Sequence, residues 1–163
     1  MERYFSVNQY LRREYGGKLY KIALDGGFSC PNRDGTIAYG GCIFCSGAGS
    51  GDFAERSDDV PAAIERAKAR VAAKHSSGKY IAYFQSFTAT HGPVEKMRRL
   101  FYQAIEHEDV AVLSIATRPD CLGDEVMALW QVPDSRDDSV TMITSCPSCT
   151  KGSMVSVNSV GLI

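Results

Sequence analysis

Three short apolar runs, each followed by a helical pattern, constrain the fold of this chain more than any other feature. The runs Leu19–Leu24, Tyr80–Phe84 and Val110–Ala116 are predicted strands, and the last two show almost no polar alternation, which is typical of strands buried on both faces. A capped helix precedes them, after Ser6, and ends at Gly16-Gly17. Helical patterns follow the runs and begin at Val60, Pro93 and Gly123. Because strands and helices alternate, we predict an α/β fold of about three βα units with parallel strands and right-handed crossovers.

Length and charge exclude several classes of protein. The chain has 163 residues, enough for one domain, and its formal net charge of −1 does not fit a strongly basic nucleic-acid binder. No apolar run reaches the roughly 18 residues of a membrane span, and the first residues lack the apolar core of a secretory signal. We therefore expect a cytoplasmic protein without membrane association. Its six cysteines then serve as ligands, catalysts or thiols rather than as disulfides.

The longest interruption of the βα pattern is a glycine-rich loop from Asp25 to about Ser57. A loop of this length in a small domain is usually functional or held by a ligand, and it follows the carboxyl end of a strand, where parallel sheets bind ligands. It contains Cys30, Cys42 and Cys45 with the spacing C-x11-C-x2-C. One tight turn directs the last two sulfurs to the same metal centre. Three thiolates leave a four-coordinate zinc one ligand short, and they leave one iron of a four-iron cluster open.

The residues alone allow alternatives to an iron–sulfur site. A zinc site is completed by Cys121 or by the second C-x2-C pair, and a non-catalytic zinc module uses Cys42, Cys45, Cys146 and Cys149. A thiol-redox role for the first C-x2-C pair fits the spacing. That role leaves Cys30 without a function, and the pair does not begin a helix directly after a strand.

The character of the sequence changes after residue 131. Residues 132–163 are rich in serine, and they sustain neither a strand nor a helix period. The stretch Val140-Thr141-Met142-Ile143-Thr144 resembles the translated leader of cloning vectors. We therefore expect a domain over residues 1–131, followed by an atypical tail over 132–163 that is frameshifted or foreign.

Several motifs together resemble the radical S-adenosylmethionine (SAM) superfamily. The likeness covers about residues 3–130 and is greatest to a bacterial radical SAM family with the same C-x11-C-x2-C spacing. It extends more distantly to the radical SAM domain of the Elongator catalytic subunit. The motifs that carry it are Asn8-Gln9-Tyr10-Leu11, Lys21-Ile22-Ala23-Leu24-Asp25, Cys30-Pro31-Asn32-Arg33-Asp34-Gly35, Gly41-Cys42-Ile43-Phe44-Cys45, Tyr83-Phe84-Gln85 and Ala116-Thr117-Arg118-Pro119-Asp120.

The resemblance implies a cofactor pair and a set of binding residues. Cys30, Cys42 and Cys45 would bind three irons of a 4Fe–4S cluster, and the fourth iron would chelate SAM. Reductive cleavage of SAM would give methionine and a 5′-deoxyadenosyl radical that acts on a substrate. Further SAM contacts are implied for Phe44 beside the adenine, Gln85, Thr117 and Arg118. Because each of these also has an ordinary structural explanation, such as an ion pair from Arg118 to Asp120 or Asp124, the roles remain expectations.

The resemblance also implies partners and a departure from the family. An electron donor such as flavodoxin or ferredoxin is implied, and the Elongator likeness makes an RNA base one candidate substrate. His91 is expected either to touch the substrate or to lie on the surface. The family's (β/α) barrel continues past three βα units, whereas the likeness ends near Trp130. We expect a truncated partial barrel with impaired catalysis and an uncovered, aggregation-prone edge at Val110–Ala116.

Overall fold

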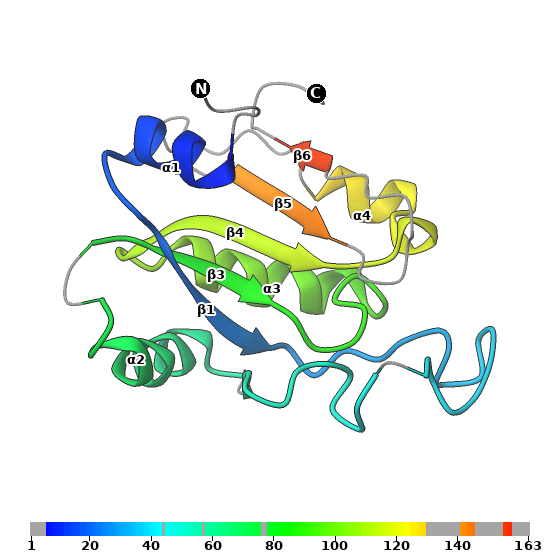
Figure 1. The fold of residues 1–163 in the computed structure, drawn as a ribbon. Helices are drawn as coiled ribbons and strands as arrows, with labels where there is room; N and C mark the ends of the chain where they lie inside the picture. Colours follow the sequence, from blue (N-terminus) through cyan, green and yellow to red (C-terminus); the bar gives the residue numbers. More distant parts are fainter. Residues whose placement is uncertain are drawn as a thin grey trace.

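A six-stranded sheet in the order β2-β1-β3-β4-β5-β6 forms the centre of the computed structural model (Figure 1). The structure describes residues 6–43, 45–56, 58–75, 78–129, 141–145 and 155–157, the last two ranges by their backbone. The strands are β1 (Tyr20–Asp25), β2 (Glu55–Arg56), β3 (Tyr80–Phe84), β4 (Val110–Ala116), β5 (Thr141–Ser145) and β6 (Val155–Val157). All neighbours pair in parallel except β6, which is antiparallel to β5. The prediction of an α/β fold with parallel strands is confirmed.

The helices form where the sequence supplies caps and an apolar face. They are α1 (Val7–Tyr15), α2 (Val60–Val71), α3 (Val94–Ile105) and α4 (Asp124–Ala128), with a 3₁₀ turn at Pro119–Cys121. Ser6 and Gln9 form a reciprocal capping box on α1, and Gly16 ends that helix with φ +70°. The Asp59 side chain caps α2 through the backbone N–H of Ala62. Pro93, predicted as the first residue of its helix, is its N-cap instead.

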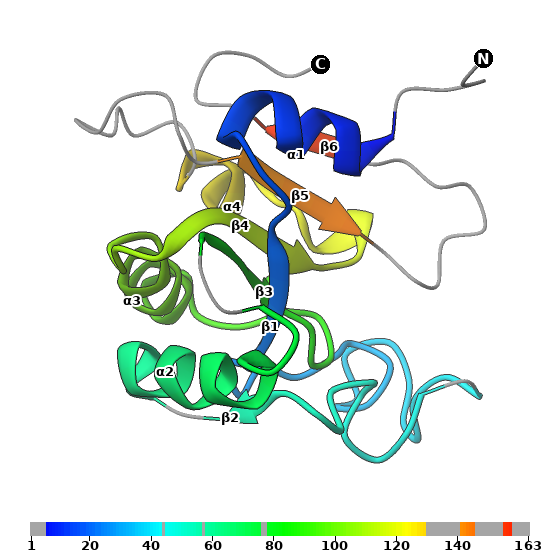
Figure 2. The same cartoon turned by 60° about the vertical axis from the view of Figure 1, so that its left-hand side comes forward.

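Helices lie on both faces of the sheet (Figure 2). On one face, α2, α3 and α4 pack over β1, β3 and β4, with Ile64, Leu100, Phe101 and Leu113 fully buried. On the other face, Leu11 of α1 packs against Leu19, Ile81, Ala111 and Val112. All seven residues of β4 are buried, as expected for a strand covered on both sides.

The structure corrects two expectations about the edges of the sheet. The loop predicted from Asp25 to about Ser57 contains β2, which extends the sheet beyond β1. The edge expected to be uncovered at β4 is paired along most of its length by β5, from Val112 with Thr141 to Ala116 with Ser145. The expectation of an open β4 edge is therefore wrong. The residues after 131 lack an apolar pattern, but strands pair through backbone hydrogen bonds, which do not require one.

No helix in the described ranges combines the length and apolar character needed to cross a membrane. The longest helices, α2 and α3, have 12 residues each, which is well short of a span.

Replacing Phe101 tests the core that supports the sheet. This side chain is fully buried between Phe84 of β3 and Phe28, which begins the segment leading to Cys30. We expect Phe101→Ala to lower the free energy of unfolding by about 3–5 kcal/mol, since it removes buried area and leaves a cavity. Phe53→Ala is the matched control, because the Phe53 side chain is 85% exposed. Equal urea midpoints for the two variants would contradict this packing.

Candidate functional site

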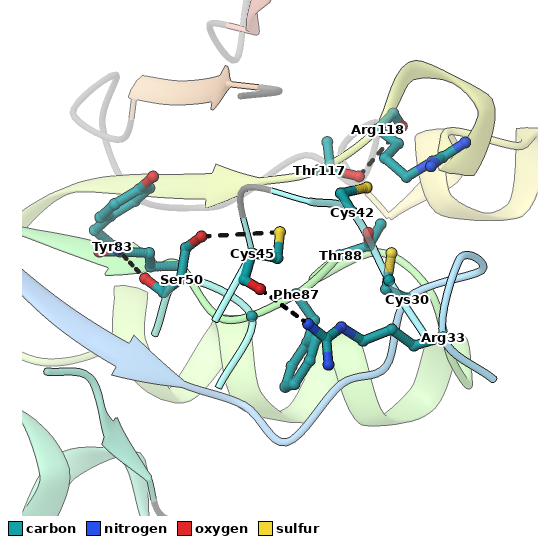
Figure 3. A pocket seen from close by; sticks show the side chains of 13 residues that line it. Cys30, Arg33, Cys42, Cys45, Ser50, Tyr83, Phe87, Thr88, Thr117 and Arg118 are labelled. Carbon is teal, nitrogen blue, oxygen red and sulfur yellow. Dashed lines mark hydrogen bonds between the residues drawn. The ribbon is translucent and has the colours of Figure 1, made fainter. Parts of the chain in front are cut away.

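A pocket lies at the carboxyl ends of the central strands and is lined by all three cysteines of the C-x11-C-x2-C motif (Figure 3). We call residues 26–54, which join β1 to β2, the cysteine loop. The pocket encloses about 660 Å³ of space, including its open mouth. It is lined by Cys30, Arg33, Gly41, Cys42, Cys45, Gly49, Ser50, Tyr83, Gln85, Phe87, Thr88, Thr117 and Arg118. The loop therefore forms one wall, and the segments after β3 and β4 form the other.

Two turns place the cysteines at the pocket. The carbonyl oxygen of Cys30 accepts the backbone N–H of Arg33 at 2.8 Å, which turns the chain directly after the first thiol. The backbone N–H of Cys45 donates to the carbonyl of Cys42 at 3.0 Å, as expected for a tight C-x2-C turn. All three thiols are partly exposed and none forms a disulfide. Cys30, Cys42 and Cys45, predicted as metal ligands, all line this one pocket.

Arg33 ties the two halves of the cysteine loop together. Its guanidinium donates to the carbonyl oxygens of Cys45 at 3.4 Å and of Ser46 at 2.6 Å, and it lies 5.4 Å from the centre of the Phe87 ring. Gly41, with φ +81°, passes directly beside it, and a Cβ there would lie 2.6 Å from Arg33 Nε. Only glycine allows this close approach without moving the arginine.

The segment after β3 is bonded to the loop on one side and to β4 on the other. The backbone N–H groups of Phe87 and Thr88 donate to the carbonyls of Gly49 and Ser29, and Ala89 N–H donates to the carbonyl of Ala116. Phe87 adopts φ +57° and Ser50 adopts φ +67°, a region that non-glycine residues rarely occupy. Uncommon backbone conformations of this kind concentrate at ligand sites, where surrounding contacts hold them in place.

Gln85 and Thr117, predicted as SAM contacts, both line this pocket. The Gln85 side-chain amide donates to the carbonyl of Ser50, so it fixes the loop and leaves its carbonyl oxygen as an acceptor. Thr117 is only 4% exposed, and its hydroxyl bonds Thr90 and the carbonyl of Arg118. The structure thus brings both residues to the cysteines, while each also has a structural partner.

Arg118 lines the pocket and forms an ion pair with Asp120. Its Nε and Nη2 donate to the two carboxylate oxygens at 2.8 and 2.6 Å. This pair raises the pKa of Arg118 and lowers the pKa of Asp120, and the nearby Cys30 raises the pKa of Arg118 further. A guanidinium has five N–H donors, and the ion pair with Asp120 uses two of them. The remaining N–H groups can bond an anionic ligand in the pocket.

The remaining predicted residues have other positions. His91 bonds Asp34 of the cysteine loop, with 2.7 Å between Nε2 and Oδ2, so it contacts the loop that carries the thiols. Cys121 is a partly buried thiol that does not line the pocket; burial raises its pKa, as does the nearby Asp120. Phe44, Cys146 and Cys149, for which the sequence predicts ligand contacts, lie outside the described residues.

Sequence reasoning missed several lining residues. The sequence pattern indicates no role in the site for Arg33, Ser50, Phe87 or Thr88, and all four line the pocket. The place of Arg33 between Cys30 and Cys42 is a usable signal, because a guanidinium has five N–H donors with which to bond loop carbonyls. Ser50 and Thr88 had no local signal, because tertiary pairing alone brings them to the pocket.

The three cysteine sulfur atoms do not form a compact group in this structure. Among the described residues, the Sγ atoms of Cys30, Cys42 and Cys45 do not all lie within 4.8 Å of one another. Thiolates around one tetrahedral zinc are only about 3.8 Å apart, given Zn–S bonds of about 2.3 Å. The three thiols in this structure are therefore spread more widely than ligands of a single zinc ion.

A second cluster of possible metal ligands, Glu65, His107 and Asp109, is an ion-pair network. The Lys68 ammonium lies 2.6 Å from a Glu65 oxygen and 2.5 Å from an Asp109 oxygen. The hydrogen bonds from Lys68 lower the pKa of Glu65 and of Asp109, and the same bonds raise the pKa of Lys68. The lysine already forms ion pairs with both carboxylates that a metal ion would need.

Comparisons with known proteins give relatives but no family. The chain is 56% identical over 127 residues to the uncharacterized protein YtqA of Bacillus subtilis, covering 77% of this chain and 39% of YtqA. It is 40% identical over 119 residues to the protein YhcC of Escherichia coli, covering 73% of this chain and 38% of YhcC. The chain therefore spans about two fifths of the length of these relatives. No protein-family model matches it, and no solved structure matches significantly.

Two adjacent glycines test the Arg33 contact. Gly40 and Gly41 both have positive φ, but a Cβ at Gly40 meets nothing within 4 Å. Alanine strains either position by about 1–2 kcal/mol. We expect Gly41→Ala also to displace Arg33 from its carbonyls, and so to lower the unfolding free energy by about 1.5–3 kcal/mol more than Gly40→Ala does. Urea titrations of the two variants measure this difference, and equal midpoints would contradict the contact.

Lys68→Met tests the ion-pair network through its pH dependence. Because the folded-state pKa values of Glu65 and Asp109 are lowered, the stabilisation is present above their ordinary values of 4.5 and 3.8 and is lost as the pH falls below them. We expect Lys68→Met to lower the unfolding free energy by about 0.5–1 kcal/mol at pH 7, and to have a smaller effect at about pH 3. Urea titrations at both pH values check this; an effect that grows in acid would contradict it.

Proposed function

We propose that this chain is the cluster-binding part of a radical SAM enzyme, in which Cys30, Cys42 and Cys45 hold a 4Fe–4S cluster. One observation carries the proposal: the three thiols share a pocket with the three described residues expected to contact SAM, Gln85, Thr117 and Arg118. These come from separate segments, up to 88 positions apart in the sequence (30 to 118). When bound, such a cluster supplies an open iron for SAM and the electron that cleaves SAM to methionine and a 5′-deoxyadenosyl radical.

The chain's own residues have the chemistry to hold and orient SAM. Arg33 and Arg118 both line the pocket, and a guanidinium suits a carboxylate. The carbonyl oxygen of Gln85 can accept an N–H, because the amide nitrogen is bonded to Ser50. Tyr83 and Phe87 supply aromatic surface on which a flat ring can pack. The pocket therefore combines a cation, a polar acceptor and apolar walls, as a charged nucleoside requires.

Partners and location follow from this chemistry as part of the proposal. Reduction of the cluster requires an electron donor such as flavodoxin or ferredoxin, and the cytosol is the compartment that keeps the thiols reduced. An RNA base remains one candidate substrate, although the net charge of −1 gives no support for nucleic-acid binding.

The decisive experiment is spin-resonance spectroscopy of the anaerobically reconstituted, reduced chain with and without SAM. We expect a 4Fe–4S signal that shifts on addition of SAM, because SAM would bind the open iron. Cys30→Ala, Cys42→Ala and Cys45→Ala should each abolish that signal. Cys121→Ala should keep it, because Cys121 does not line the pocket.

Other outcomes would change the assignment. A colourless chain that holds one zinc would overturn the proposal in favour of the non-catalytic module that includes Cys146 and Cys149. A cluster without a response to SAM would limit the function to cluster binding. Loss of the signal in Cys121→Ala would mean that the ligand set is wrong.

A further inference from the structure

The side chain of Asn32 points its amide at a proposed cluster ligand. Its Nδ2 lies 3.2 Å from Cys42 Sγ, within hydrogen-bond reach of sulfur. A cysteine that ligates iron is a thiolate without a proton, so the bond then runs from the amide N–H to the sulfur. A backbone bond also holds Asn32 beside Cys42, because the N–H of Gly41, the residue before Cys42, donates to the carbonyl of Asn32 at 2.9 Å.

The other described contacts to these sulfurs are weaker. Ser50 Oγ lies 3.9 Å from Cys45 Sγ, close to the limit for a bond to sulfur. The neighbouring side chains of the same turn have different partners: Arg33 bonds loop carbonyls, and Asp34 bonds Thr36 and His91. Within Asn32-Arg33-Asp34, Asn32 is therefore the residue that acts on a ligand atom.

We propose that Asn32 sets the reduction potential of the cluster by donating a hydrogen bond to the Cys42 thiolate. This inference rests on the proposed function, since it requires that Cys42 ligates the cluster. Reduction adds an electron that increases the negative charge on the thiolates, so a donated N–H stabilises the reduced state more than the oxidised state. Asn32 thus raises the potential and makes the cluster easier for an electron donor to reduce.

A redox titration followed by spin resonance tests this role. Asn32→Leu keeps the branched shape and the number of heavy atoms of the side chain and removes the donor, while the backbone bond to Gly41 remains. We expect the ratio of reduced to oxidised cluster at a fixed potential to fall about tenfold. The variant loses a hydrogen bond to a charged sulfur that stabilises the reduced state more than the oxidised state. For a one-electron couple this is a shift of about 59 mV to lower potential. Thr36→Ala is the control, because its hydroxyl bonds Asp34 and no sulfur.

The direction of the shift separates a lost hydrogen bond from a loosened loop. Water entering a loosened site stabilises the more highly charged reduced cluster and would raise the potential. A lower potential in Asn32→Leu with full iron content therefore supports the proposal. An unchanged or higher potential overturns it and leaves the proposed function standing.

Two further outcomes are distinguishable. If the unmodified chain binds no cluster, the proposed function fails first and this inference fails with it. If Asn32→Leu alone fails to hold a cluster, Asn32→Ala and Asn32→Ser decide, since serine retains a hydroxyl donor and alanine does not. A potential equal in the serine, alanine and unmodified chains would overturn the role of Asn32.

Discussion

The hydrogen-bonded parallel pairing of β1, β3 and β4 is the constraint on which the rest of this structure depends. Its register aligns Leu24 with Phe84 and Phe84 with Ile115, so the three strands end at the same edge of the sheet. The pairing then continues into the loops, through the bonds from Gln85 N–H to Leu24 and from Ala89 N–H to Ala116. The pocket exists because three chain segments leave the sheet at this one edge.

The cysteine loop is held by side chains from its own first turn. Asn32, Arg33 and Asp34 bond a sulfur, two carbonyls and a histidine respectively, each of which lies 10 or more residues away. The loop has little apolar core of its own, and Ile37, Tyr39 and Ile43 are exposed. Polar contacts and close glycine packing therefore replace hydrophobic burial as the source of its order.

The two clusters of potential ligands differ in position and in charge balance. The thiols lie at the carboxyl ends of the strands, where parallel sheets bind ligands. The carboxylates of Glu65 and Asp109 lie beside the start of β4, and both form ion pairs with Lys68. A group of metal-ligating residues therefore indicates a metal site only where the ligands are not already paired with a cationic side chain of the protein.

The sequence by itself determined the central strands and the helices, but not β2, β5 or β6, because helix caps and apolar periods depend on neighbours in the chain. α1 begins after Ser6 and ends at Gly16, and β3 and β4 have the predicted bounds. The topology also predicted that the cysteine loop meets the strand ends. Only the tertiary structure decided that Ser50 and Thr88 line the pocket, that Arg118 pairs with Asp120 rather than Asp124, and that β5 covers β4. These depend on strand register and on contacts between distant residues, for which no local pattern of residues carries a signal.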